Sequence, residues 1–264
     1  MEPRGPYVSI LSSDFEAVAQ IGTNGLPFLT EWIRYQPSRA YLSFWSVAIE
    51  MVDELPEPVV PESFRDWIQH SRAMYRSEAT VEAFEILGPA AASSVPELFS
   101  IVNDRANLDA AQRATHALSA VGPAAYPALL EIASNTNAPT RREAIYSLGK
   151  MGTNAVAAIP MLIQTLDGID GDNARAAATA LGRLALEPDL VIPTLTSALQ
   201  RPEHLVRWVA ADALAAYGTN AAPAVPALRL ALADQHPYVR EAVSNALQII
   251  TSRLAAETAE PMPR

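Results

Sequence analysis

The stretch from Arg207 to Asp234, RWVAADALAAYGTNAAPAVPALRLALAD, decides the predicted fold. In its first half, Ala210, Leu214 and Tyr217 recur at helical spacing, which places them on one apolar face of a helix. Gly218 follows the last of them. We expect it to end this helix, because glycine adopts the left-handed conformation at little cost.

The second half predicts another helix. Thr219 or Asn220 would cap it by accepting hydrogen bonds from its first N–H groups. Pro226 would lie within its first turns, where a proline ring is tolerated. Leu228 and Leu232 would continue the buried face.

Other parts of the chain repeat this pattern in a fixed register. Five prolines follow one another at steps of 31, 33, 33 and 33 residues: Pro96, Pro127, Pro160, Pro193 and Pro226. A column of apolar residues lies nine positions before four of them: Leu87, Met151, Leu184 and Tyr217. Two columns in one register indicate an internal two-helix repeat. Such a unit cannot bury its apolar stripe alone, so neighbouring units must stack.

Three motifs carry a family resemblance. VRWVAADALAAYG, AAPAVPALRLALAD and YVREAVSNALQII resemble HEAT repeats, in the short bacterial form also found in phycobilisome lyase-type proteins. The resemblance covers Glu78 to about Leu254, with one further unit near Asp14 to Trp32. It implies a solenoid whose second helices line a concave groove.

The resemblance also implies a ladder of aspartate and arginine side chains between neighbouring repeats. Asp234 and Arg240 have the residue types and spacing that the ladder requires. Arginines take comparable places in other units, at Arg113, Arg175 and Arg207. Gln200 stands near a position where an aspartate is expected, so the ladder is incomplete in the middle units.

The predicted fold class is all-α: a right-handed α-solenoid of stacked antiparallel helix pairs, with an irregular, aromatic-rich helical insertion near the N-terminus. Four parts are predicted. They are an N-terminal lead and first helix pair (1–36), the insertion or cap with its proline-rich linker (37–77), the repeat array (78–254) and a disordered tail (255–264).

Composition restricts the possible functions. The formal net charge of −10 disfavours general binding to nucleic acids or anionic membranes. The absence of cysteine excludes disulfides, thiolate zinc sites and a cysteine nucleophile. No long apolar segment lies near the N-terminus, which favours a cytoplasmic protein, although an exported form whose signal has been removed stays open. We expect no cofactor.

Two columns on the second helices are the candidate partner surface. Counted from each proline, positions +2 and +6 are expected in the core, and +1 and +4 toward solvent. The +1 column is Glu97, Ala128, Met161, Thr194 and Ala227, and the +4 column is Ser100, Glu131, Gln164, Ser197 and Leu230. The candidate groove residues are Glu97, Glu131, Gln164, Ser197 and, at the edge, Arg229. This row suits a peptide or a partner helix better than an anion.

The aromatic insertion allows two interpretations. It is either a layer that closes one end of the array, as terminal repeats require, or a pocket lined by Trp45, Trp67 and His70. Trp208, at the edge of an apolar helix face, is either packed against a neighbour or exposed as a contact residue.

The most site-like loop runs from Asp167 to Asn173, with three carboxylates and two glycines. It resembles a calcium loop in composition, but EF-hand spacing is absent. The preferred interpretation is an inter-repeat turn in which Asp172 or Asn173 caps the following helix. No two of the four histidines have metal-ligand spacing on one helix: His70, His116, His204 and His236. Carboxylate pairs that share helix faces are interpreted as solvated surface: Glu50 with Asp53 or Glu54, and Glu62 with Asp66.

These patterns favour a non-enzymatic binding or scaffold module that takes a protein or peptide through its groove or its aromatic cap. One alternative is an enzyme on a HEAT-like scaffold, similar to alkyl-purine DNA glycosylases or bilin lyases, which the acidic charge and missing motifs disfavour. Another is a self-associating array with an exposed apolar end between Tyr238 and Leu254, where Val243, Leu247 and Ile250 lack a following repeat. We expect a monomer or a weak homo-oligomer.

Overall fold

The computed structural model describes residues 21–34 and 72–259. Within these ranges the regular elements are all helical and no strand occurs, which confirms the all-α prediction. The contacts divide the chain into two compact units, Met1–Ala125 and Tyr126–Arg264. No helix in the described ranges is long and apolar enough to span a membrane.

The first unit consists of helices that pack around α7. In chain order its elements are η1 (Gly22–Gly25), α2 (Leu26–Ile33), α5 (Arg72–Leu87), η2 (Gly88–Ser94), α6 (Val95–Val102), α7 (Leu108–Val121) and η3 (Gly122–Ala125). Helices α5 and α6 both pack on α7, and α2 packs on α5. Helix α5 begins inside the segment predicted as part of the insertion (37–77).

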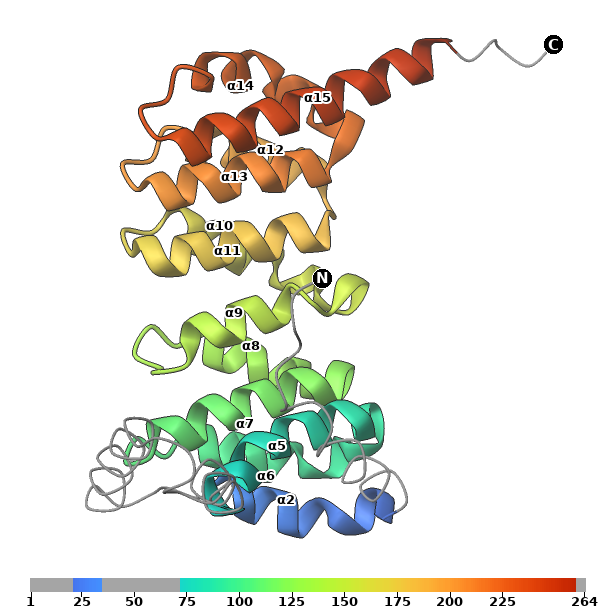
Figure 1. Cartoon of the computed structure of the whole chain (residues 1–264), viewed down its shortest axis with the longest axis vertical. Helices are drawn as coiled ribbons and strands as arrows, with labels where there is room; N and C mark the ends of the chain where they lie inside the picture. The colour runs from blue at the N-terminus through green and yellow to red at the C-terminus, as the bar shows by residue number, and fades with distance from the viewer. Residues whose placement is uncertain (1–20, 35–71, 260–264) are drawn as a thin grey trace, which may run out of the picture. The chain divides into compact units, whose positions relative to one another are not determined.

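The second unit is a stack of helix pairs. Its elements are α8 (Tyr126–Ser134), α9 (Arg141–Leu148), η4 (Gly152–Ala158), α10 (Ile159–Asp167), α11 (Gly171–Leu184), α12 (Pro188–Ala198), α13 (His204–Ala216), η5 (Gly218–Ala224), α14 (Val225–Ala231) and α15 (Pro237–Ala259). The first helices of the pairs, α9, α11, α13 and α15, contact one another in order and form one layer (Figure 1). The second helices, α8, α10, α12 and α14, lie behind them (Figure 1).

Glycines end most first helices as predicted, but the segment that follows them differs from the prediction. Gly152 and Gly218 have φ values of 55° and 57°, in the left-handed region. Each then begins a 3-10 segment, and no side chain caps it. The predicted capping by Thr219 or Asn220 is therefore wrong. In the equivalent turn Asn154 donates through Nδ2 to the carbonyl of Met151 at 3.2 Å.

The proline column keeps its register but not always its place in the helix. Pro96, Pro160 and Pro226 occupy the first turn of their helices, as predicted. Pro193 instead lies inside α12, which begins earlier, at Pro188. The connection before α12 has no 3-10 segment, so the helix takes up residues that other repeats use for the turn.

The core consists of aliphatic side chains and alanines in the predicted register. The leucine two positions after each proline has no exposed surface: Leu98, Leu129, Leu162, Leu195 and Leu228. Between first helices the backbones come close together. A Cβ added to Gly149 would lie 2.6 Å from the Cα of Ala180, and one added to Gly182 would lie 2.8 Å from the Cα of Ala213. Small residues therefore permit this layer, as the many alanines predict.

Helix α15, the last helix that the structure describes, packs its apolar side on α13 and α14. Val243 and Ile250 are fully buried against the preceding repeat. The outward positions are polar, among them Glu241, Asn245 and Gln248. Of the three residues expected to lack cover, Val243 and Ile250 are therefore buried and Leu247 is partly exposed, while Tyr238 is 63% exposed, and self-association through this end stays a prediction. The helix also continues to Ala259, beyond Ala255, where the disordered tail was predicted to begin.

Candidate partner-binding surface

The second helices of the second unit present a row of exposed side chains at the +4 position. Glu131 on α8, Gln164 on α10, Ser197 on α12 and Leu230 on α14 are all exposed. Each comes two residues after the fully buried core leucine of its helix. The sequence register thus places these side chains on the solvent side. Their role in binding stays a prediction.

The +1 column was predicted to face solvent, and in this unit that prediction is wrong. Ala128 is buried, and Met161, Thr194 and Ala227 are only partly exposed. Residues four apart share a helix face, and the residues at +5 are buried: Ile132, Thr165, Ala198 and Ala231. The +1 side chains lie over that buried face, so they contribute little to the surface.

Glu97 belongs to the other unit and already has a partner there. Its Oε1 accepts a hydrogen bond from Nη1 of Arg34 at 3.1 Å, and both side chains are about half exposed. This ion pair joins α6 to the end of α2. Trp45 and Trp67, with His70, lie outside the described residues.

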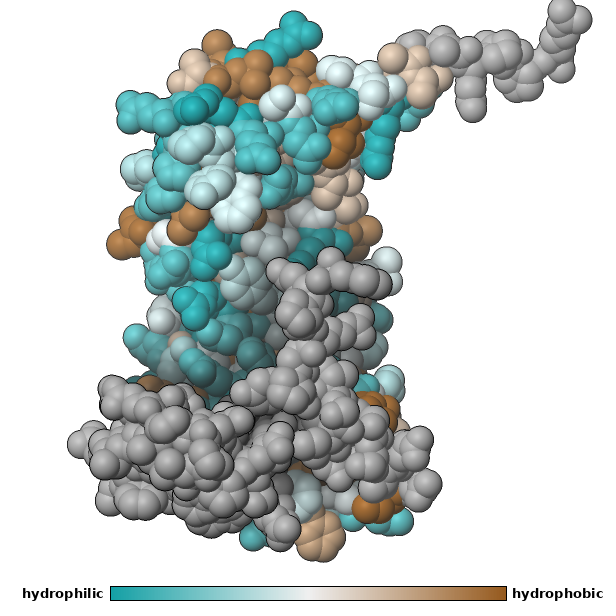
Figure 2. Space-filling view, viewed as in Figure 1, coloured by the Kyte–Doolittle hydropathy of each residue, from teal (hydrophilic) through white to brown (hydrophobic). Residues whose placement is uncertain are grey.

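The row ends in an apolar patch on α14. Leu230 is 76% exposed and Leu232 is 43% exposed. Leu232 was predicted to be core, and its equivalents Leu166 and Leu199 are buried. In the described residues no second helix follows α15, which leaves this side of α14 without a neighbour. Hydrophobic atoms gather over α14 in Figure 2, and Arg229 is exposed beside them.

The inter-repeat turns carry a polar network rather than a ligand site. Arg207 donates from Nε and Nη2 to the two carboxylate oxygens of Asp234, at 2.7 and 2.9 Å. Its Nη1 donates to the carbonyls of Arg201 and Pro202, each at 2.8 Å. Hydrogen bonds from Arg207 hold the pKa of Asp234 below its ordinary value, against the opposing effect of burial.

This geometry corrects the predicted ladder. The side chain of Asp234 binds Arg207, at the start of its own repeat, and not Arg240, in the next one. Arg240 donates instead to the backbone carbonyls of Asp234 and Gln235, at 2.8 and 3.0 Å. Arg175 makes only a loose pair with Asp172, at 3.9 Å. In the other unit, Arg113 donates to the carbonyl of Ile33, so it holds the end of α2.

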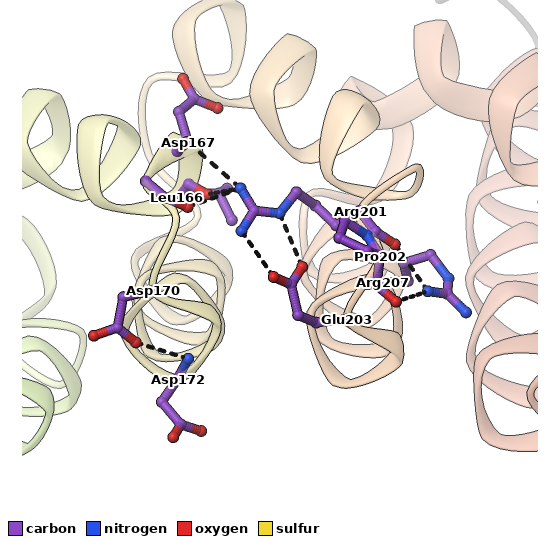
Figure 3. A network of polar contacts seen from close by, with 9 residues as sticks. Leu166, Asp167, Asp170, Asp172, Arg201, Pro202, Glu203 and Arg207 are labelled. Carbon is purple, nitrogen blue, oxygen red and sulfur yellow. Dashed lines mark hydrogen bonds and ion pairs between the residues drawn. The ribbon is translucent and has the colours of Figure 1, made fainter.

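Arg201 occupies the position where Asp234 stands one repeat later. Its Nη1 donates to the carbonyl of Gly168 at 2.8 Å. It also lies within hydrogen-bonding distance of the carbonyls of Leu166 and Asp167, at 3.5 and 3.4 Å (Figure 3). Glu203 accepts from its Nε at 3.1 Å (Figure 3). A positive charge therefore replaces the negative charge of the aspartate at this ladder position. Instead of pairing with an arginine, the Arg201 side chain caps the carbonyl end of α10.

The Asp167–Asn173 loop has a capping role, but at a different residue from the one predicted. The helix is capped by Asp170, whose Oδ1 accepts from the backbone N–H groups of Asp172 and Asn173, each at 3.1 Å (Figure 3 shows the first). These bonds lower the pKa of Asp170. Within the described residues, no three histidine or carboxylate side chains are grouped as a metal site requires.

Two histidines form a contact that sequence reasoning missed. The rings of His204 and His236 stack with centroids 4.0 Å apart, and Tyr238 is tilted against His236 at 5.4 Å. Their near-equivalent places in successive turns were the available signal. His116 lies exposed on α7, and Trp208 is partly exposed on α13. The carboxylate pairs at Glu50, Asp53, Glu54, Glu62 and Asp66 lie outside the described residues.

Comparison with known proteins gives a family match. A model of HEAT repeats matches residues 95–182 and 159–248, which together cover more than half of the 264 residues. A search of curated proteins gives no match.

Several solved structures show partial similarity. A designed armadillo repeat protein in complex with peptide (KR)4 is 14% identical, with a TM-score of 0.49, over 68% of this chain and 95% of that one. Human deoxyhypusine hydroxylase is 18% identical, with a TM-score of 0.40, over 89% of this chain and 98% of that one. The complex of CpcE and CpcF of phycocyanin lyase from a Nostoc species is 20% identical, with a TM-score of 0.41, over 92% of this chain and 90% of that one.

Proposed function

The chain belongs to the HEAT-repeat family, and we propose that it is a binding module that holds a peptide or helix of a partner protein along the second helices of its second unit. The proposed contact residues are the exposed row Glu131, Gln164, Ser197 and Leu230, together with Arg229 at its edge. A row of this kind repeats one chemical position per repeat, which suits an elongated ligand.

The exposure of Leu230 carries this proposal. Leu230 is 76% exposed and Leu232 is 43% exposed, and adjacent exposed apolar side chains form the kind of patch that marks an interaction site. The polar residues of the row then lead to one apolar anchor at its end, and in many interfaces a few such side chains supply most of the binding energy. The partner should therefore present an apolar side chain to α14 and polar groups along α8 to α12.

Affinity capture from the native extract tests this role, with Leu230→Ser as the decisive variant. A partner that uses the anchor should be recovered at least about tenfold less well, since a hot-spot residue contributes about 2 kcal/mol. Ile169→Ser is the matched control, because Ile169 is 99% exposed but lies in the α10–α11 turn. Equal recovery of every partner by both variants would exclude α14 as the anchor.

Glu97 and the aromatic residues Trp45 and Trp67 remain predicted contacts of a separate kind. Glu97→Gln would remove the ion pair with Arg34 and so test whether that carboxylate serves the first unit or a partner. For the two tryptophans, a partner captured by the full chain should change their fluorescence. An enzymatic role would appear in the same captures as turnover of the bound molecule.

A further inference from the structure

We propose that the outer face of α9 and α11 is a second binding surface, which takes an acidic peptide segment of a partner protein. It lies on the first helices, whereas the proposed partner row lies on the second helices. Its defining residues, which we call the basic patch, are Arg142, Lys150, Arg175 and Arg183.

Most side chains of the first helices are buried, so only a narrow row of side chains on each helix is exposed to solvent. From Ala174 to the end of α11, every residue is buried except Arg175, Thr179 and Arg183. These three follow the i, i+4, i+8 spacing of a single helix face. One repeat earlier the same row consists of Arg142, Tyr146 and Lys150. The patch therefore repeats in register on α11 and on α9 with the turn that follows it, where Lys150 lies.

The basic character is local to these two helices. The same row on α13 is Trp208, Asp212 and Ala216, and on α15 it begins with Glu241 and Asn245. The chain as a whole has a formal net charge of −10. A face that concentrates cations, including the sole lysine of the sequence, is therefore an exception to the general surface.

The positive charge of the patch is only partly compensated. Arg142 pairs with Glu143 at 3.0 Å, and Arg175 pairs loosely with Asp172 at 3.9 Å. Lys150 and Arg183 form no ion pair within the described part of the chain. The exposed Lys150 and Arg183 are therefore the cations available to carboxylates of a ligand.

Spacing and number of charges favour a peptide over a polyphosphate. Arg175 and Arg183 are eight residues apart, a rise of about 12 Å, and packed helices lie about 8–10 Å apart. Carboxylates about three residues apart on an extended chain match these separations. Arginine binds such groups in a two-pronged geometry. Nucleic-acid binding relies on many neutralised phosphates, which two uncompensated cations on an acidic protein do not provide.

Fluorescence anisotropy with the full chain tests the proposal. The probe is a labelled, glycine-rich synthetic peptide with glutamate at every third position, and the same peptide with glutamine is its control. Binding of the glutamate peptide at low salt is expected, with loss as ionic strength rises. Arg183→Glu should weaken binding of the glutamate peptide about fivefold. The double variant that also carries Lys150→Glu should weaken it at least about tenfold.

Arg105→Glu is the matched control, because Arg105 is exposed in a turn of the first unit and undergoes the same charge change. An equal loss with this variant would show an effect of net charge alone and overturn the proposal. So would absence of binding, or binding of a poly-dT oligonucleotide or phosphatidylserine vesicles in preference to the peptide. If Arg183→Glu lowers the melting temperature, Arg183→Gln replaces it. Leu230→Ser should leave this binding unchanged, so the two proposed surfaces fail independently.

Discussion

Asp234 is the residue at which charge and folding are most closely linked. Its side chain is 9% exposed and that of Arg207 is 15% exposed, so neither charge is fully hydrated. Asp234 also accepts from the backbone N–H of His236 at 2.8 Å, which fixes the turn before α15. Removing this carboxylate would leave a partly buried guanidinium without its counter-charge, which is costly.

Asp234→Asn should lower the free energy of unfolding by about 2–3 kcal/mol, because the amide keeps the turn but not the charge pair. The matched control is Asp172→Asn, whose side chain is 69% exposed and whose ion pair is loose. That change should cost less than about 0.5 kcal/mol. Urea denaturation of both variants measures the difference. Equal costs would mean that burial of the Asp234 pair has no energetic effect.

The same pair predicts a pH dependence with a definite sign. The pKa of Asp234 is lower in the folded protein than in the unfolded chain, mainly because Arg207 donates to it. Below about pH 4 the unfolded state therefore binds more protons, and the stabilisation falls as the pH decreases through the folded pKa. The stability difference between wild type and Asp234→Asn should be constant near neutral pH and shrink below about pH 4. A difference that grows in acid would contradict this assignment.

Ala185 has a backbone conformation that its residue type does not predict. It ends α11 in the left-handed conformation, with a φ of 47°, where the other repeats use glycine. Ala185→Gly should raise the free energy of unfolding by about 0.5–1 kcal/mol, because the steric strain exceeds the entropy that glycine adds to the unfolded chain. Ala255→Gly, at an exposed position in α15, should instead lower it, since glycine weakens a helix. Thermal melting distinguishes the two. A stability loss in both variants would exclude strain at Ala185.

At the scale of elements, the close packing of the first helices depends on glycines in the repeat register. Gly149 and Gly182 are 33 residues apart, and each would place a Cβ within 3 Å of an alanine Cα on the next first helix. The distances are to backbone atoms, which cannot move without shifting a whole helix. The layer therefore leaves no room for a methyl group at these positions.

Gly182→Ala should destabilise the protein by about 2–3 kcal/mol, because α11 and α13 must separate. Gly171→Ala is the comparison, since the added Cβ there meets Cγ of Glu203 at 2.9 Å, a side chain that can rotate away. That change should cost little. Denaturant midpoints measure both effects. Similarly small losses in both variants would indicate that the contact between α11 and α13 can accommodate a methyl group.

The elements were predictable where the residue type itself requires a conformation. Glycine in the left-handed region and leucine at +2 could be predicted because each has a strong physical preference. The 3-10 segments were missed, because Thr219 and Asn220 are equally good caps and turn formers. The place of Pro193 inside α12 was missed for a related reason, since a helix start depends on the length of the preceding connection.

At the scale of the whole molecule, the sequence predicted which side chains of the second helices are exposed. It did not predict which side chains pair with one another. Periodicity places Glu131 and Gln164 toward solvent, since it depends only on the helix angle. It does not indicate which arginine binds Asp234, because two arginines lie within reach of that turn in the linear sequence. The exposure of Leu232 likewise follows from where the stack of second helices ends, a property of the assembled repeats rather than of the residue.

Removing helix α15 tests whether the repeat before it depends on a neighbouring helix for its stability. A chain that ends after His236 lacks α15, which buries Val239, Val243, Ala246 and Ile250 against the preceding repeat. Its loss should cost at least about 5 kcal/mol and expose the apolar side of α13, so we expect a lower melting temperature and association in light scattering. A chain that ends after Ala255 keeps all four side chains and should melt close to the full chain. If both truncations melt alike and remain monomeric, α15 does not cap the array, and nearest-neighbour stacking is not what stabilises its final repeat.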